Sequence, residues 1–360
     1  MTIKSLVSLF LGKIKPNSEL KNVDLSTFQK DFNRVLYAYL DDKLLKYKEI
    51  AKGDSLAVEA LSHAISIIKN GGKRVRPYMC FLAYVTEGGG DYDKILRTSV
   101  ALELFHAFAL IHDDIIDEGL ERHGTPTLHV HIEEVVAPKP RGNKKHIAEG
   151  IALLAGDLVF SFAHEVMASA ENREAQKIFF TMVEEVVAGQ MLDVSFMLTY
   201  KVDSSTIEHK NVLKTALYSF VNPMLIGSRL AKSTSHDENY RAFGLFLGQA
   251  FQIQDDLLDI IGNSKDTGKQ TFLDVQEGQH TILSQYIFER ASERDVEVLR
   301  SLFGKSVDDH GRKVLSRLFE STGSIDFAQK EVGQLIAKAR VHALSPQWHA
   351  LVDLISNRIA

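Results

Sequence analysis

The 360-residue sequence has few of the residues that stabilise secreted proteins or interrupt helices. It contains one cysteine, Cys80, and only seven prolines. A single cysteine cannot form an internal disulfide, which argues against a disulfide-stabilised secreted protein and favours a reducing compartment. The net charge of −5 is mild, so nothing in the composition points to nucleic acid or to an anionic membrane surface.

Long apolar runs are missing as well. No uninterrupted run approaches the roughly 20 apolar residues that span a bilayer. The N-terminal stretch SLVSLFLGKIK is shorter than that and lacks the small-residue cleavage pattern of a signal peptide. It could lie on a membrane as an amphipathic helix, but we favour docking on the protein's own surface. We therefore expect a cytoplasmic protein without a transmembrane segment.

Helical periodicity is present along most of the chain. In 26–45, apolar residues from Phe28 to Leu40 share one face, behind a Ser26–Gln29 capping box. Similar patterns cover 55–72, 95–118, 147–170, 173–198, 205–231, 237–261 and 279–303, and strand patterns are scarce. The most loop-like segment, 133–146, reads as a surface insertion or a basic flap. The sequence predicts an N-terminal extension (1–24) and one all-α domain (25–360).

Two acidic clusters with the same spacing lie in apolar surroundings. They are Asp113, Asp114 and Asp117 in ALIHDDIIDEG, and Asp255, Asp256 and Asp259 in AFQIQDDLLDIIG. On a helix, the first and last aspartate of each cluster lie one turn apart on one face. Crowded carboxylates repel one another and are costly to bury unpaired, so the pattern predicts bound cations. Oxygen ligands of this kind suit Mg²⁺, and nothing resembles the glycine-bearing Ca²⁺ loop.

Residues that could hold phosphate groups accompany both clusters. They are Lys73, Arg74 and Arg76 in NGGKRVRP, Arg122 and His123 in ERHGTPT, Lys214 and Thr215 in LKTALYS, and Lys269 in KDTGKQ. Each alone would pass as an ordinary surface residue. Together with two acidic clusters, they indicate a site for two diphosphates.

In their order along the chain, these segments resemble the trans-isoprenyl diphosphate synthases, the polyprenyl synthetase family. The resemblance runs from about residue 60 to about residue 285 and rests on GGKRVRP, HAFALIHDDIIDEGLERHGTPT, LLAGDLVF, GQMLDV, KTA, GQAFQIQDDLLD and TGK. It implies a single-domain helical bundle around a central cavity, three Mg²⁺ ions and a homodimer. The implied reaction joins isopentenyl diphosphate to dimethylallyl, geranyl or farnesyl diphosphate, without a side-chain nucleophile.

The same resemblance assigns roles residue by residue. The six aspartates would bind metal together with the allylic diphosphate. Arg122, Lys214, Thr215 and Lys269 match residues that grip the allylic diphosphate, Lys73, Arg76 and His106 match residues that hold isopentenyl diphosphate, and Gln252 matches a polar residue on the metal side.

Two positions depart from the family pattern. His123 follows Arg122 where the family usually has a second arginine, which serves isopentenyl diphosphate. Because histidine is only partly charged at neutral pH, we predict that affinity for isopentenyl diphosphate weakens between about pH 6 and 8 and that His123→Arg flattens this trend. Gln279 stands where EGKxT often has lysine, which predicts some loss of allylic diphosphate affinity.

Product length in this family depends on bulky residues just upstream of the first aspartate motif. Here Phe108 and Ala109 precede Asp113 by five and four residues, and Phe105 lies one turn below Ala109. An aromatic residue followed by a small one resembles geranylgeranyl diphosphate synthases, so we predict that product. Farnesyl or longer products remain alternatives, and both phenylalanines could be ordinary core residues.

Two other functions compete with this prediction. Class I terpene cyclases share the helical bundle, but they usually carry an N-S-E-like second metal motif and lack GGKRxRP. Non-catalytic partner subunits of heteromeric synthases typically lose one or both aspartate motifs. This chain has GGKRVRP and both aspartate motifs, which favours a catalytic prenyltransferase.

Overall fold

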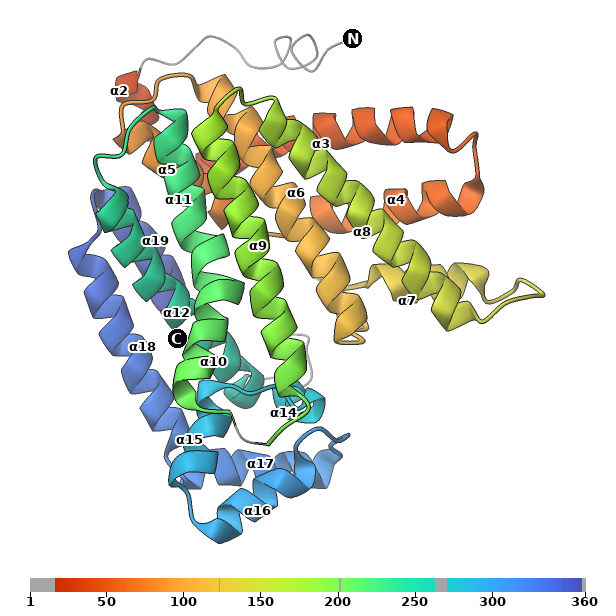
Figure 1. The fold of residues 1–360 in the computed structure, drawn as a ribbon, viewed down its shortest axis with the longest axis vertical. Coiled ribbons are helices and arrows are strands. Elements are labelled where there is room, and N and C mark those ends of the chain that lie inside the picture. The colour runs from red at the N-terminus through yellow and green to blue at the C-terminus, as the bar shows by residue number, and fades with distance from the viewer. Residues whose placement is uncertain (1–16, 123, 201, 263–270, 358–360) are drawn as a thin grey trace. The chain divides into compact units, whose positions relative to one another are not determined.

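The computed structural model describes residues 17–122, 124–200, 202–262 and 271–357. The N-terminal stretch, His123 and Lys269 lie outside this part of the chain, and so do the predictions made for them. Helices make up nearly all the regular structure of the described residues (Figure 1). The chain divides into two compact units, 1–176 with 226–234, and 177–225 with 235–360. The all-α prediction is confirmed.

The first unit is built around α6 (Tyr92–Ile116), which packs along α8 (Lys144–Ala168) and also contacts α3, α5 and α7 (Figure 1). The elements around it are α2 (Asn17–Leu20), α3 (Leu25–Ile50), α4 (Ser55–Asn70), α5 (Val75–Thr86), β1 (Glu121–Arg122), β2 (Thr125–Pro126) and α7 (Leu128–Val136). Residue Glu121 pairs with Pro126 in the two-stranded antiparallel β1–β2 ribbon. The sequence patterns gave no sign of this ribbon.

Helix ends in the first unit follow local chemistry. The Asp24 carboxylate accepts a hydrogen bond from the Thr27 amide at 2.7 Å, so α3 begins one residue before Ser26. The predicted Ser26–Gln29 capping box is therefore wrong, because an earlier acid takes the N-cap. Helix α4 ends at Asn70, and Gly71 is its C-cap, so the glycine pair at 71–72 terminates the helix. The predicted loop 133–146 is helical at both ends, in α7 and α8, so only 137–143 connects them.

Helices α6 and α8 are long and apolar enough to cross a membrane by length and composition. Within the most apolar window of each, 67% of α6 and 44% of α8 is buried inside the protein. Helix α6 also carries Asp113 and Asp114 at its end. Burial explains the apolar character of α6, since core helices need apolar residues on several faces.

The second unit is built around α12 (Asp237–Ile261), which packs against η1 (Val212–Val221) and α18 (Ser324–Val341). A Cβ on Gly248 would lie 2.5 Å from the Ala216 Cα, so this glycine permits the close α12–η1 contact. The remaining elements are α9 (Arg173–Phe196), which begins in the first unit, α10 (Ser204–Asn211), α11 (Asn222–Leu230), which ends there, α14 (Leu273–Glu277), α15 (Ile282–Arg290), α16 (Glu293–Leu302), α17 (Asp309–Ser321) and α19 (Pro346–Ser356).

Candidate active site in two halves

The first aspartate motif lies at the C-terminal end of α6. Asp113 and Asp114 occupy the last turn, and Asp117 is the C-cap, whose backbone N–H donates to the Asp113 carbonyl at 2.8 Å. Asp114 is buried, whereas Asp113 and Asp117 are half-buried. The predicted arrangement of two acids one turn apart, with a third beside them, is therefore present.

Arg122 is the ionic partner of Asp114. It lies on β1, and its Nε donates to both Asp114 carboxylate oxygens, at 3.0 and 3.3 Å, while its NH2 group contacts Oδ1. Burial raises the pKa of the Asp114 carboxyl, and the guanidinium opposes this rise. The β-ribbon turn is held in place by Thr127, whose hydroxyl donates to the Gly119 carbonyl at 2.7 Å. The short ribbon thus brings a permanent cation back to the acidic end of α6.

The glycine-rich turn lies close to the same acidic end. A small cavity of about 30 Å³ is lined by Gly71, Gly72, His106 and Asp114, among other residues. The structure therefore brings His106, which was predicted for isopentenyl diphosphate, and the two glycines that begin GGKRVRP to the first aspartate motif. Lys73 is exposed, and Arg76 is half-buried in the first turn of α5.

Arg74, the middle cation of GGKRVRP, has a structural partner. It is 3% exposed, and its NH1 group lies 2.5 Å from Glu103 Oε1 on α6. Its NH2 group donates to the Ile68 carbonyl at 2.7 Å. These contacts join α4, the turn and α6. Arg74 therefore holds the turn in position.

The second aspartate motif lies in the last two turns of α12. Asp256 is buried, and Asp255 and Asp259 are half-buried. The Gln252 amide donates to Asp256 Oδ1 at 2.8 Å, and the Thr215 hydroxyl donates to Gln252 Oε1 at 2.5 Å. Thr215 and Gln252, both predicted as site residues, are therefore joined to the motif in one hydrogen-bonded chain.

Carboxylates are concentrated around this second motif. Asp259 accepts hydrogen bonds from the backbone amides of Leu273, at 2.9 Å, and Asp274, at 3.2 Å. Burial raises the pKa of Asp256 to about 7, although the Lys210 ammonium and the Gln252 amide oppose it. Burial also raises the pKa of Asp274 well above its ordinary value, and Asp259 adds to this effect. Burial and mutual repulsion thus act together on the carboxylates of this unit.

Lys214 lies in the π-helical segment η1 and is tied to Asp193 of the GQMLDV motif. Its Nζ lies 2.7 Å from Asp193 Oδ2, and Lys210 Nζ lies 2.8 Å from Asp193 Oδ1. A Cβ on Gly189 would lie 2.7 Å from the Lys214 amide nitrogen, so this glycine lets α9 approach η1. Burial alone would raise the pKa of Asp193, but the two ammonium groups hold it below its ordinary value. The sequence reading missed the roles of Asp193 and Lys210.

An aromatic cluster lies between α6 and α8. Phe108 stacks on Phe160 at 4.5 Å between ring centroids, and Phe105 lies 5.9 Å from Phe160. Phe160 also packs edge-on against His164 at 4.3 Å. The structure therefore adds two α8 residues to the pair predicted from the sequence. Phe160 belongs to LLAGDLVF, but nothing in that motif indicates its partner.

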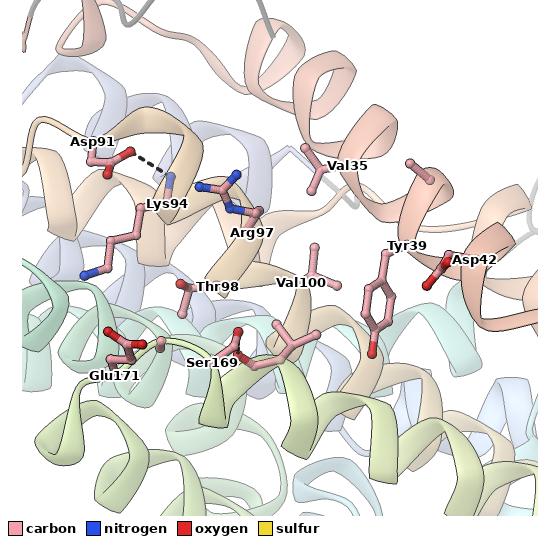
Figure 2. Close-up of a pocket in the computed structure, with 13 residues that line it drawn as sticks. Val35, Tyr39, Asp42, Asp91, Lys94, Arg97, Thr98, Val100, Ser169 and Glu171 are labelled. Carbon is pink, nitrogen blue, oxygen red and sulfur yellow. Dashed lines mark hydrogen bonds between the residues drawn. The ribbon is translucent and has the colours of Figure 1, made fainter. Parts of the chain in front are cut away.

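A separate cavity of about 320 Å³ lies further along α6, towards its N-terminal end. Lys94 and Glu171 lie at one end and Tyr39 and Asp42 at the other, with Val100 between them (Figure 2). Val100 precedes Asp113 by 13 residues, which places this cavity roughly 20 Å from the aspartates along the helix. It is therefore separate from the acidic end of α6.

The donor set of both motifs fits Mg²⁺. Among the described residues, no three His, Cys, Asp or Glu side chains are grouped closely enough to form a metal site by themselves. Mg²⁺ does not need such a group, because it typically takes one or two protein carboxylates and completes its shell with water and substrate phosphate oxygens. Half-buried aspartates one turn apart on each helix supply ligands of that kind.

Comparisons with known proteins agree with these motifs. A family model described as polyprenyl synthetase matches residues 58–319. A short chain isoprenyl diphosphate synthase of Methanocaldococcus jannaschii is 30% identical over 305 residues, which cover 83% of this chain and 85% of its own. A geranylgeranyl diphosphate synthase of Saccharolobus solfataricus is 31% identical over 271 residues, or 72% and 75% of the two chains.

Solved structures give the same result. A geranylgeranyl pyrophosphate synthase of Corynebacterium glutamicum, complexed with isoprenyl diphosphate and magnesium, matches with a TM-score of 0.84 and 26% identity, over 91% of this chain and 98% of its own. A geranylgeranyl pyrophosphate synthetase of Pyrococcus horikoshii matches with a TM-score of 0.74 and 27% identity, over 92% and 99%. The chain belongs to the polyprenyl synthetase family and is an isoprenyl diphosphate synthase, a trans-prenyltransferase.

Proposed function

We propose that the protein is a Mg²⁺-dependent enzyme that condenses isopentenyl diphosphate with an allylic diphosphate to an all-trans prenyl diphosphate, most simply geranylgeranyl diphosphate. One observation carries this proposal: each aspartate motif is bonded to its own phosphate-binding candidates. Arg122 is paired with Asp114, and Thr215 reaches Asp256 through Gln252. Three Mg²⁺ ions are the number expected from the family resemblance.

The proposed reaction is an electrophilic alkylation. Bound Mg²⁺ would stabilise charge on the leaving diphosphate. Arg122, Lys214, Thr215 and Lys269 would hold that diphosphate while its C–O bond breaks, which leaves an allylic cation. The double bond of isopentenyl diphosphate, held by His106, Lys73, Arg76 and His123, then forms the new C–C bond. One proton leaves with the released diphosphate, and apolar residues around the cation keep water away.

The product length would be set by the aromatic cluster. Phe108 on α6 stacks on Phe160 on α8, and Ala109, next to Phe108 in the chain, would be small enough to admit a growing product. A geranylgeranyl product agrees with the names of several relatives, although the relative in Aeropyrum pernix, 28% identical, is a geranylfarnesyl diphosphate synthase. We therefore propose that Phe105, Phe108 and Phe160 form the floor of the product channel.

Truncation of the cluster tests this floor. Phe108→Ala and Phe160→Ala should each lengthen the product made from farnesyl diphosphate, and the double variant should lengthen it further. Phe162→Ala is the matched control, because Phe162 lies on the same helix but packs on Tyr39, with ring centroids 6.3 Å apart. An unchanged product length in both single variants, or equal lengthening in the control, would show that the aromatic cluster does not form the floor of the product channel.

We also propose a cytoplasmic homodimer. Phe180, Val187, Met191 and Val194 of α9 are exposed although apolar, and they recur at the spacing of one helix face. The family resemblance implies a homodimer, and a second copy would cover this stripe. Light scattering should give the mass of two chains, and Met191→Glu should shift it towards one. A monomeric wild-type protein would contradict the proposal.

The decisive experiment incubates the purified protein with Mg²⁺, isopentenyl diphosphate and each allylic diphosphate in turn, followed by chromatography of the products. We expect prenyl diphosphates that lengthen by five-carbon units and disappear when EDTA removes the metal. Hydrocarbons made from one allylic diphosphate alone would indicate a cyclase. No product without a second protein chain would indicate a partner subunit.

A further inference from the structure

The turn at residues 277–281 contains no lysine, yet an ammonium group reaches it from another element. Lys210, on α10, donates to the His280 carbonyl at 3.2 Å and to Asp193 at 2.8 Å. Gln279 itself is bound locally, since its side chain donates to Glu277 at 2.9 Å and its backbone N–H to the Asp274 carbonyl at 2.7 Å. The turn itself therefore contains no lysine or arginine, but Lys210 of α10 places a positive charge beside it.

Lys210 is 5% exposed and Asp193 is 4% exposed, so both charges lie out of the solvent. A buried ammonium is costly unless it is paired and hydrogen-bonded, and here it has both kinds of contact. It also lies one helical turn before Lys214 in the chain, and the two lysines bind opposite oxygens of one carboxylate. Nothing in this arrangement resembles an ordinary surface lysine.

The charges of this trio decide what Lys214 can do. With Lys214 as its only partner, Asp193 would cancel the charge of the residue proposed to hold a diphosphate. With Lys210 present, two ammonium groups and one carboxylate leave one positive charge. Lys210 and Asp193 are buried and Lys214 is half-buried, so electrostatic interactions within the trio are stronger than in bulk water.

We propose that Lys210 is a positioning residue that keeps Lys214 electrostatically available for diphosphate and supplies the charge that position 279 lacks. This rests on the proposed function, because Lys214 is assigned to diphosphate there. Lys210 acts through Asp193 and the 277–281 turn. The occupant of the site is a diphosphate group held together with Mg²⁺, which both the allylic substrate and inorganic diphosphate carry.

The test measures binding of inorganic diphosphate in the presence of Mg²⁺ by titration calorimetry, independently of turnover. Lys210→Met should weaken binding about tenfold, the effect of losing one charge a few ångströms from an anion in a partly buried site. Lys210→Arg should stay within about threefold of wild type, since the charge is kept. Lys305→Met is the matched control: this exposed lysine also donates to a carbonyl, Ser301 O at 2.8 Å, and its loss should change nothing.

A rescue separates charge from structure. Gln279→Lys in the Lys210→Met background should recover most of the lost affinity, whereas a purely structural role of Lys210 could not be restored from position 279. If Lys210→Met does not fold, Lys210→Met with Asp193→Asn removes both members of the buried pair, which is tolerated better than removing one. That double variant should bind diphosphate about as well as wild type, because it again leaves one positive charge.

Unchanged binding in Lys210→Met, no rescue by Gln279→Lys, or weak binding in the folded double variant would each overturn the inference. Failure of the proposed function looks different. In that case the wild-type protein makes no prenyl diphosphate, while the order of diphosphate affinities among the variants remains.

Discussion

The two aspartate motifs share one spacing but are balanced in different ways. Asp114 has an arginine from a neighbouring ribbon, which stays protonated at any ordinary pH. Asp256 has an amide from Gln252, and Lys210 and Lys214 are bound to a third acid, Asp193. The negative charge of Asp114 in the first motif is therefore balanced directly by a cation of the same unit. Asp256 in the second motif is instead stabilised through a network of polar groups. The same sequence pattern can thus lead to different dependence on added cations.

The largest effect should come from the half-buried acids of the two motifs. Asp113→Ala and Asp255→Ala should each reduce kcat/KM about a thousandfold, by loss of metal-borne stabilisation of the leaving group. Asp309→Ala, at a 94% exposed side chain, is the control and should leave the rate unchanged. Initial rates with saturating Mg²⁺ check this. A tenfold difference between the two motif variants would show that they contribute unequally.

Single-partner removal tests the difference in charge balance. Arg122→Met leaves the buried Asp114 without its cation and should cost about 3–5 kcal/mol of unfolding free energy. Lys210→Met leaves Asp193 paired with Lys214 at 2.7 Å, so its cost should be nearer 1 kcal/mol. Urea unfolding of both variants without Mg²⁺ checks the order. Equal losses of unfolding free energy in the two variants would mean that the buried carboxylates Asp114 and Asp193 depend on their cations to the same extent.

Much of this comparison could be read from the sequence. The two motifs and their helical placement follow from short-range spacing, because the first and last aspartates of each motif are only four positions apart. The pairing of Arg122 with Asp114 was not predicted, because it depends on the β1–β2 ribbon. The Lys210–Asp193–Lys214 network could not be predicted in this way. Asp193 and Lys214 are 21 residues apart on different elements, and their contact depends on how α9 packs against η1.

The aromatic floor shows the same limit. Phe108 was predicted because it precedes Asp113 by a fixed number of residues, whereas Phe160 stacks on it from a second helix 52 positions away. The capping box at Ser26 was wrong for a different reason. Two residues suited to capping, Asp24 and Ser26, lie close together, and only the backbone geometry decides between them.

A smaller effect should follow from the hydrogen-bonded chain in the second half. Thr215→Val removes the donor to Gln252 Oε1 and leaves the Gln252 amide free to turn away from Asp256. One such bond contributes about 1 kcal/mol, so kcat/KM should fall roughly fivefold. Thr215→Ser keeps the hydroxyl and should stay near wild type. A similar loss in both variants would indicate that the methyl group, and not the hydrogen bond, matters.

The smallest effect concerns the pH dependence of stability, to which buried histidines of the two units contribute. Burial lowers the pKa of His280, and nearby Lys210 lowers it further. The Thr199 carbonyl, 2.7 Å from the ring nitrogen, and Asp193 oppose this shift in the pKa without reversing it. The folded protein therefore binds fewer protons than the unfolded chain, so the stabilising contribution is present above about pH 6.5 and is lost as pH falls through the folded-state pKa.

His280→Gln keeps a donor for Thr199 but cannot titrate. Unfolding midpoints in urea measured at about pH 5 and about pH 8 should therefore differ less in this variant than in wild type. The remaining slope should come from histidines of the first unit such as His63, whose pKa burial also lowers. His63→Gln could instead remove the loss of stability at acid pH while His280→Gln does not. In that case the pH dependence would come from the first unit, which contains Arg122 and Asp114, and the prediction for His280 would be wrong.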